Sequence, residues 1–298
     1  MQHIPMSRHA RGFTVLEVLV ALVLLGLVSA ALYRVLVNNQ RLYMAQTERI
    51  DLSQNIRAAA AILPAEFREL DASEGDIAAM SADSIQIRGM RWLGFLCAVP
   101  PLGGALNGVG LIIRGGAPGQ PLFFGARGIN PTDEVMVYYD GNQASRADDF
   151  WAQASVTAAP NGQNCTDGTN GQRIITNINL LGLGANVAGA ITMGAPVRGY
   201  ERVTYKLYQS TDGLWYIGFR PFGQTMQPLI GPVLPNGLTL QYYNVNGIAT
   251  AVPNQVARID ITVRARTTSA VRRGGQAAAQ VVVDSIVTSV ALRNNRRF

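Results

Sequence analysis

The residues that could do chemistry in this chain are concentrated near its start, where one carboxylate stands in a long apolar run. Glu17 is the only charged residue in the stretch 13–33. A charge at membrane depth costs about 2–4 kcal/mol or more, so a carboxylate kept there is expected to have a partner. Gly12 and Phe13 meet just before the run. The junction and the acid together predict a processing site and a binding partner for the acid.

Catalytic chemistry has little support elsewhere in the sequence. The only histidines are His3 and His9, which both precede the apolar run. A Ser-His-Asp site, a Cys-His site or a His-bound metal is therefore excluded once the leader is removed. The patterns of nucleophile elbows, P-loops, paired-cysteine sites and zinc proteases are also absent. We expect no enzyme, no catalytic residue, no cofactor and no metal; the alternative is an envelope enzyme that uses carboxylates alone.

The loop at residues 167–171 places several oxygen ligands close together. It lacks the glutamate that an EF-hand loop carries at its twelfth position. An Asx-type turn, in which an aspartate side chain accepts a backbone hydrogen bond, therefore explains the loop better than a calcium site.

Two cysteines, Cys97 and Cys165, are present. Outside the cytoplasm they could form a disulfide that closes a long loop, a bond for which chain entropy predicts roughly 4 kcal/mol. The alternative is a pair of buried thiols. The membrane anchor favours the disulfide, because it places the following domain in an oxidising compartment.

The formal charge is +6, and arginine supplies nearly all of the positive charge. Most of the arginines are scattered, but some gather near the end of the chain: Arg264, Arg266, Arg272, Arg273, Arg293, Arg296 and Arg297. No aromatic residues alternate with this cluster, which argues against base stacking. We therefore interpret it as a solvated strand edge and tail, and we do not expect nucleic acid as a partner.

The chain divides into four expected segments: a basic leader at 1–12, a transmembrane half-helix at 13–33, an amphipathic half-helix at 34–71 and a β-rich head domain at 72–298. The apolar run is about 31 Å long as a helix, which matches a bilayer core. A one-sided stripe then recurs at helical spacing, formed by Leu52, Ile56, Ala60, Leu63, Phe67 and Leu70. We expect one helix of about fifty residues, with a kink or a break at Pro64.

After Ser73 the pattern changes to short β-type runs separated by Gly, Pro, Asn and Asp. Strands are predicted at 84–88, 134–139, 174–180, 203–208, 214–219, 238–243, 257–266 and 281–292. The run 257–266 alternates apolar and polar residues, as in a sheet with one buried face. A hairpin turn is expected at 210–213. The stretches 94–130 and 160–199 are interpreted as long loops with short strands. The predicted fold class is α+β, with a long N-terminal helix packed on an antiparallel β-rich domain.

The segment from Gly12 to Leu22, behind its short basic leader, resembles the class III signal of type IV pilins and type II secretion pseudopilins. The later part resembles the PulJ/PilW-like minor subunits more loosely, through the run that begins at Arg202, the hairpin after it and the end of the last strand. The resemblance implies a prepilin peptidase that cuts between Gly12 and Phe13 and methylates the amine of Phe13. It also implies that Glu17 pairs with that amine on the next subunit during assembly.

The implied role is a minor pilin or pseudopilin that initiates or caps a filament. Its partners would be prepilin peptidase, other minor and major subunits, an inner-membrane assembly platform and, before assembly, membrane lipid. The head domain would lie in the periplasm and, after assembly, at the filament tip. The alternative is a tip-located binding module on the same anchor: an adhesin, a secretion-substrate receptor or a DNA-uptake receptor. A pilus, a secretion pseudopilus and a competence machine all remain open.

Overall fold

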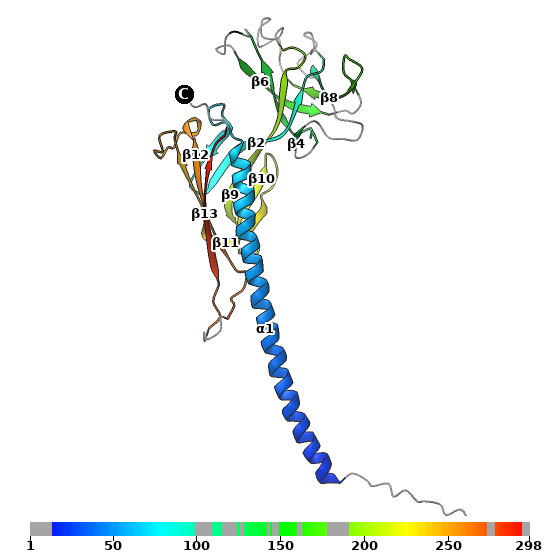
Figure 1. Cartoon of the computed structure of the whole chain (residues 1–298), viewed down its shortest axis with the longest axis vertical. Coiled ribbons are helices and arrows are strands. Elements are labelled where there is room, and N and C mark those ends of the chain that lie inside the picture. Colours follow the sequence, from blue (N-terminus) through cyan, green and yellow to red (C-terminus); the bar gives the residue numbers. More distant parts are fainter. Residues whose placement is uncertain are drawn as a thin grey trace, which may run out of the picture. The chain divides into compact units, whose positions relative to one another are not determined.

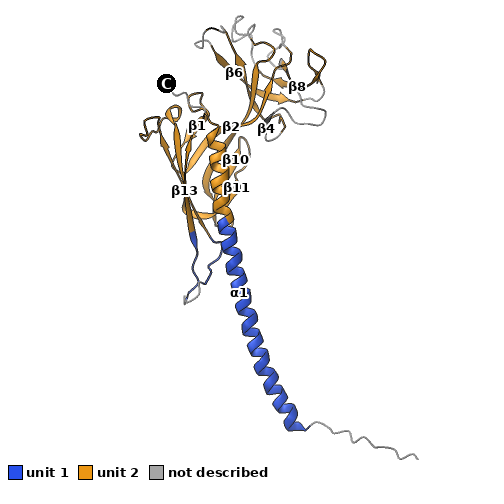
Figure 2. Ribbon diagram, viewed as in Figure 1, with its two compact units in different colours: residues 1–53, 267–283 blue, residues 54–266, 284–298 orange. Residues whose placement is uncertain are grey.

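The computed structural model describes residues 14–98, 109–114, 124–125, 128–141, 144, 149–159, 163–177, 191–272 and 278–293. These residues form one long helix followed by a β-rich region. The chain divides into two compact units, residues 1–53 with 267–283 and residues 54–266 with 284–298 (Figure 2). The division falls inside the helix, so the first unit contains its apolar half and the second contains its last turns.

Helix α1 spans Val15–Arg68 and is continuous over 54 residues (Figure 1). At 1.5 Å per residue its length is about 81 Å. The expected single long helix is therefore confirmed. Its buried positions are Leu52, Ile56, Ala59, Leu63, Pro64 and Phe67. Ala59 takes the place predicted for Ala60, because the spacing of the buried positions changes from four to three between Ile56 and Ala59.

Of the two alternatives expected at Pro64, a kink or a break, the break is wrong, since α1 continues through this residue. Proline removes one backbone donor, but only one further turn follows before the helix ends at Arg68. Leu63 and Phe67 are almost fully buried on either side of it, and this packing stabilises the last helical turn. The helix also ends earlier than expected. The Asp71 carboxylate accepts the backbone N–H of Ser73 and starts a turn there.

The remaining chain forms a sheet whose interstrand pairs are antiparallel, which confirms the α+β class. Its main path runs β13-β12-β11-β10-β9-β5-β6-β8-β3. The strands are β1 (Ile77–Met80), β2 (Ser84–Phe95), β3 (Val109–Arg114), β4 (Phe124–Gly125), β5 (Glu134–Tyr139), β6 (Phe150–Ala158), β7 (Gln163–Asn164), β8 (Asn170–Thr176), β9 (Pro196–Gln209), β10 (Trp215–Pro221), β11 (Gln227–Tyr243), β12 (Arg258–Arg266) and β13 (Val283–Ala291). A 3-10 turn at Pro253–Gln255 precedes β12.

A long ribbon of β2 and β9 connects the two ends of this sheet (Figure 1). The two strands pair from Ser84↔Lys206 to Phe95↔Pro196. On its other edge, β9 pairs with β5 through its first half and with β10 through its second half. One strand therefore belongs to both parts of the sheet.

The β5, β6, β8 and β3 end of the sheet encloses its own apolar core. Trp92 lies at its centre with 1% of its surface exposed. A Cβ atom at position 199 would lie 1.8 Å from the Trp92 ring, so only glycine permits this packing. The indole N–H donates to the Asp133 carboxylate at 3.1 Å, which satisfies the one polar atom that the ring carries into the core.

The predicted strands all have counterparts, but most boundaries differ. The run 134–139 coincides with β5, and β12 buries Ile259, Ile261, Val263 and Ala265 as its alternation predicts. The 210–213 turn joins β9 to β10, with Gly213 at φ 78°. Strands β2, β9 and β11 are each several residues longer than expected, and β1 and β6 are absent from the prediction. Tertiary pairing supplies the hydrogen bonds that extend or create these strands.

Candidate assembly site

The first turn of α1 carries Glu17, the carboxylate that the sequence singled out. Its backbone N–H donates to the Thr14 hydroxyl at 3.2 Å and to the Thr14 carbonyl at 3.1 Å. Thr14 therefore caps the helix. The spacing Thr14-x-x-Glu17 is that of a capping box, a signal that the sequence prediction missed. Gly12 and Phe13 lie outside the described residues.

The apolar half of α1 is exposed along its whole length. Every residue in 14–36 is exposed, including the large side chains of Leu19, Leu25 and Leu32. The helix is long and apolar enough to cross a membrane. An apolar surface of this extent requires lipid or other helices around it.

The start of the chain has a counterpart among known protein families. Residues 7–33 match the prokaryotic N-terminal methylation motif. This match includes Gly12, Phe13 and Glu17, and it supports a type IV pilin-like protein, a structural subunit processed by prepilin peptidase and assembled with other pilins. Together with the apolar helix, it indicates membrane anchoring. No curated protein and no solved structure matches the chain.

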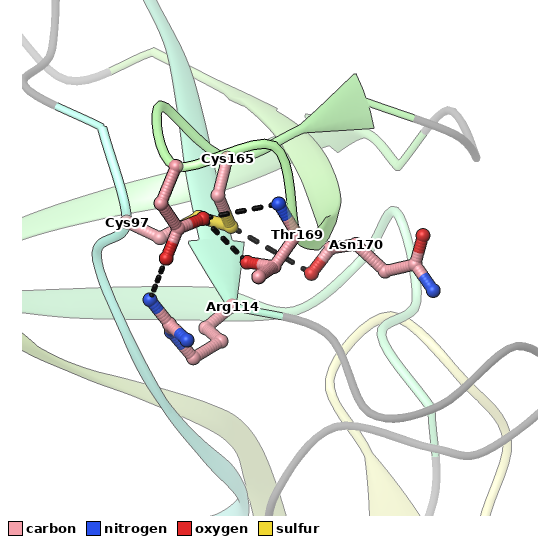
Figure 3. The surroundings of a disulfide bond; sticks show 6 residues. Cys97, Arg114, Cys165, Thr169 and Asn170 are labelled. Atoms are coloured by element: carbon pink, nitrogen blue, oxygen red, sulfur yellow. Dashed lines mark hydrogen bonds and ion pairs between the residues drawn. A yellow bond between two sulfur atoms is a disulfide. The ribbon is translucent and has the colours of Figure 1, made fainter.

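Cys97 and Cys165 form a disulfide with a Cα–Cα distance of 5.2 Å (Figure 3). Cys97 follows β2, and Cys165 lies in the turn between β7 and β8. Both residues are buried. Neither is available for thiol chemistry. The bond closes a loop that contains β3 to β7.

The turn after Cys165 is the predicted Asx turn. The Asp167 carboxylate accepts the Thr169 hydroxyl at 2.6 Å and the Thr169 backbone N–H at 3.1 Å, and it pairs with Arg114 from β3 (Figure 3). The two hydrogen bonds from Thr169, with the Arg114 guanidinium, lower the pKa of Asp167 to about 2. Among the described residues, no group of three or more His, Cys, Asp or Glu side chains could hold a metal.

An ion cluster that sequence reasoning missed holds the last turns of α1 against the sheet. Arg91 on β2 lies between two carboxylates, at 3.1 Å from Glu66 of α1 and 3.0 Å from Glu201 of β9. Burial alone would lower the pKa of Arg91, but the combined attraction of these carboxylates outweighs it and raises that pKa. The three residues come from distant parts of the chain, so no local pattern could have predicted them.

A second buried pair lies next to it. Arg88 on β2 is 3.1 Å from the Asp76 carboxylate, which also accepts the Asp71 backbone N–H at 2.8 Å. Burial raises the pKa of Asp76, and these two contacts only partly oppose the rise. The Phe67 and Tyr205 rings meet edge to face at 5.8 Å on the same part of the sheet. The Phe67 contact packs the end of α1 on the sheet within the second unit.

Proposed function

We propose that this protein is a minor pilin or pseudopilin that helps to initiate or cap a type IV pilus or a type II secretion pseudopilus. The supporting observation is that the methylation motif at 7–33 overlaps the start of a 54-residue helix whose apolar half is exposed. Prepilin peptidase would cut between Gly12 and Phe13 and methylate the new amine. The leader would be lost and the apolar helix would be kept.

Glu17 is the assembly contact in this proposal. Its carboxylate pairs with the Phe13 amine of the neighbouring subunit, so two charges that are costly in an apolar bundle neutralise each other. The pairing sets the axial position at which a new subunit docks. Apolar packing between helices supplies the remaining association energy, because leaving lipid for a helix bundle gains mainly close packing.

Two features favour a minor subunit over a major one. α1 has no proline before Pro64, so its apolar half is a continuous helix. Such a helix is long enough to extend through a bundle of subunit helices. The β-rich region that follows the helix is also large, at residues 72–298. A low-copy position at the filament tip would accommodate this region, which would lie in the periplasm before assembly.

Intact-mass analysis of the membrane-extracted protein tests the processing step. In a strain with active prepilin peptidase, the protein should begin at a methylated Phe13. In a strain without the peptidase, it should retain residues 1–12. A mature protein that begins at Met1 or after Ala31 in the active strain would refute the proposal.

A matched pair of variants tests the assembly contact. Glu17→Gln removes the charge at nearly constant volume, and we expect normal processing but loss of the protein from the sheared surface fraction or the pseudopilus. Asp51→Asn makes the same chemical change at an exposed position of α1 beyond the apolar half, and it should leave both steps intact. Wild-type incorporation of Glu17→Gln would contradict the pairing. Adjacent secretion or pilus genes would identify the machine.

A further inference from the structure

A groove of about 600 Å³ lies in the first unit, between α1 and the hairpin that follows β12 (Figure 2). The described residues of this hairpin are 267–272 and 278–283. Its two arms pair through Val271 and Gln280, which exchange backbone hydrogen bonds at 2.9 and 3.0 Å. The lining of the groove includes Asn38, Arg41, Leu42 and Met44 from α1 and Val271 and Arg272 from the hairpin.

Glu48 of α1 holds the hairpin beside the helix. Its carboxylate accepts the Thr268 backbone N–H at 2.7 Å and the Ser269 backbone N–H at 3.2 Å. Both are charge-assisted hydrogen bonds, which are stronger than neutral ones. From this contact the hairpin extends along α1 towards the apolar half, because it lines the groove together with Asn38 and Arg41, which precede Glu48.

The charged side chains around the groove are all arginines. In residues 34–47 of α1 and in the described residues of the hairpin, they are Arg34, Arg41 and Arg272. Arg34 and Arg41 are about two helical turns apart and lie on the same face of α1. Arg41 and Arg272 are exposed, and neither makes an ion pair within the part of the chain that the structure describes. The groove therefore carries two positive charges without an acidic partner among the described residues.

The apolar half of α1 places this groove at the level of a membrane surface. When the run that ends at Tyr33 fills the hydrocarbon core, Asn38 and Arg41 lie about 8 and 12 Å beyond its edge. The headgroup layer occupies about 5–8 Å on each side of the core. Long helical side chains point back towards the helix N-terminus, so Arg41 extends towards that layer. Position and charge together favour an anionic group of the membrane surface as the occupant.

We propose that this groove binds the headgroup of an anionic phospholipid, with the lipid phosphate between Arg41 and Arg272. Two guanidinium groups suit a phosphate because each can donate two hydrogen bonds to its oxygens. Leu42, Met44 and Val271 provide apolar contacts for the carbon atoms of the headgroup. Basic pockets beside membrane helices recognise lipids in this way. The inference depends on membrane anchoring and not on the pairing of Glu17, so it can fail without affecting the assembly proposal.

The test uses the full chain in nonionic detergent micelles, with methionine methyl groups labelled with carbon-13 for NMR. Met44 reports from the groove, and the exposed Met193 of the second unit is an internal control. The probe is dioleoylphosphatidylglycerol; dioleoylphosphatidylcholine has the same phosphate and acyl chains without a net charge. We expect saturable shifts of Met44 only, with the anionic lipid binding at least about tenfold more tightly. Inorganic phosphate at the same concentration should not shift Met44, because it is not concentrated at the micelle surface.

Variants assign the contact to the two arginines. Arg41→Gln and Arg272→Gln should each weaken binding of the anionic lipid by about fivefold, and the double variant by about thirtyfold. Arg49→Gln makes the same change at an exposed position about 12 Å further along the helix, and it should alter binding by less than about twofold. Equal binding of the two lipids, an equal response to inorganic phosphate, or wild-type binding by the double variant would overturn the proposal. The comparison of the two lipids on the unmodified chain is decisive by itself, since it needs no variant to fold.

Discussion

Removal of the disulfide should lower the free energy of unfolding of the second unit by about 4 kcal/mol. Cys97 and Cys165 are separated by 68 positions, and closing a loop of that length removes roughly 15 cal/mol/K of entropy from the unfolded chain. That entropy corresponds to about 4 kcal/mol at 25 °C. The perturbation is the double variant Cys97→Ala/Cys165→Ala, which avoids placing a hydroxyl at a buried position.

Urea unfolding of the full chain in detergent measures the loss, with tryptophan fluorescence as the signal. Trp92 is a suitable reporter because it is buried in the core that the disulfide-closed loop contributes to. The free energy is obtained by linear extrapolation to water. Wild-type protein in reductant should unfold at the same urea concentration as the double variant. Reductant should not change the unfolding of the variant itself. A loss below about 1 kcal/mol, with the bond verified by mass in the oxidised protein, would refute the loop-entropy reasoning.

Three further outcomes follow from the contacts. Phe67→Ala should destabilise the protein by about 3–5 kcal/mol in urea unfolding, because Phe67 is fully buried, whereas Phe222→Ala at a 69% exposed site should cost less than about 1 kcal/mol. The pKa of Asp167 is lowered from 3.8 to about 2. The ionised Asp167 carboxylate therefore stabilises the folded protein above about pH 4, and this contribution is lost as the pH falls towards 2. Asp167→Asn should remove this part of the pH dependence of the urea midpoint. The Glu48 carboxylate accepts the Thr268 backbone N–H at 2.7 Å, so Glu48→Ala should speed hydrogen exchange at that amide, and unchanged exchange would contradict the contact.

Much of the secondary structure could be predicted because it depends on local patterns. The long helix follows from an apolar run joined to a stripe of helical spacing, and β12 follows from strict alternation. The helix break considered at Pro64 does not occur, because burial of the neighbouring residues competes with the local effect of proline. Leu63 and Phe67 hold the last turn in place, and the sequence alone does not show how firmly. The long strands β9 and β11 were underestimated because their extra residues gain hydrogen bonds from paired strands, mainly from the distant β2 in β9 and from the preceding β10 in β11.

The sequence by itself determined the methylation motif and the membrane-length helix, because both are contiguous and need no distant partner. It also identified Glu17 by the cost of a charge in an apolar run. Only the tertiary structure decided that Cys97 and Cys165 are close enough to bond, that Arg91 bridges Glu66 and Glu201, and that Arg198 stacks on Trp151. The Arg91 contacts join residues 110 and 25 positions apart through the pairing of β2 with β9 and through the end of α1. Arg198 and Trp151 are brought together by the pairing of β9 with β5 and of β5 with β6. Such proximity arises from strand register, which no local pattern encodes.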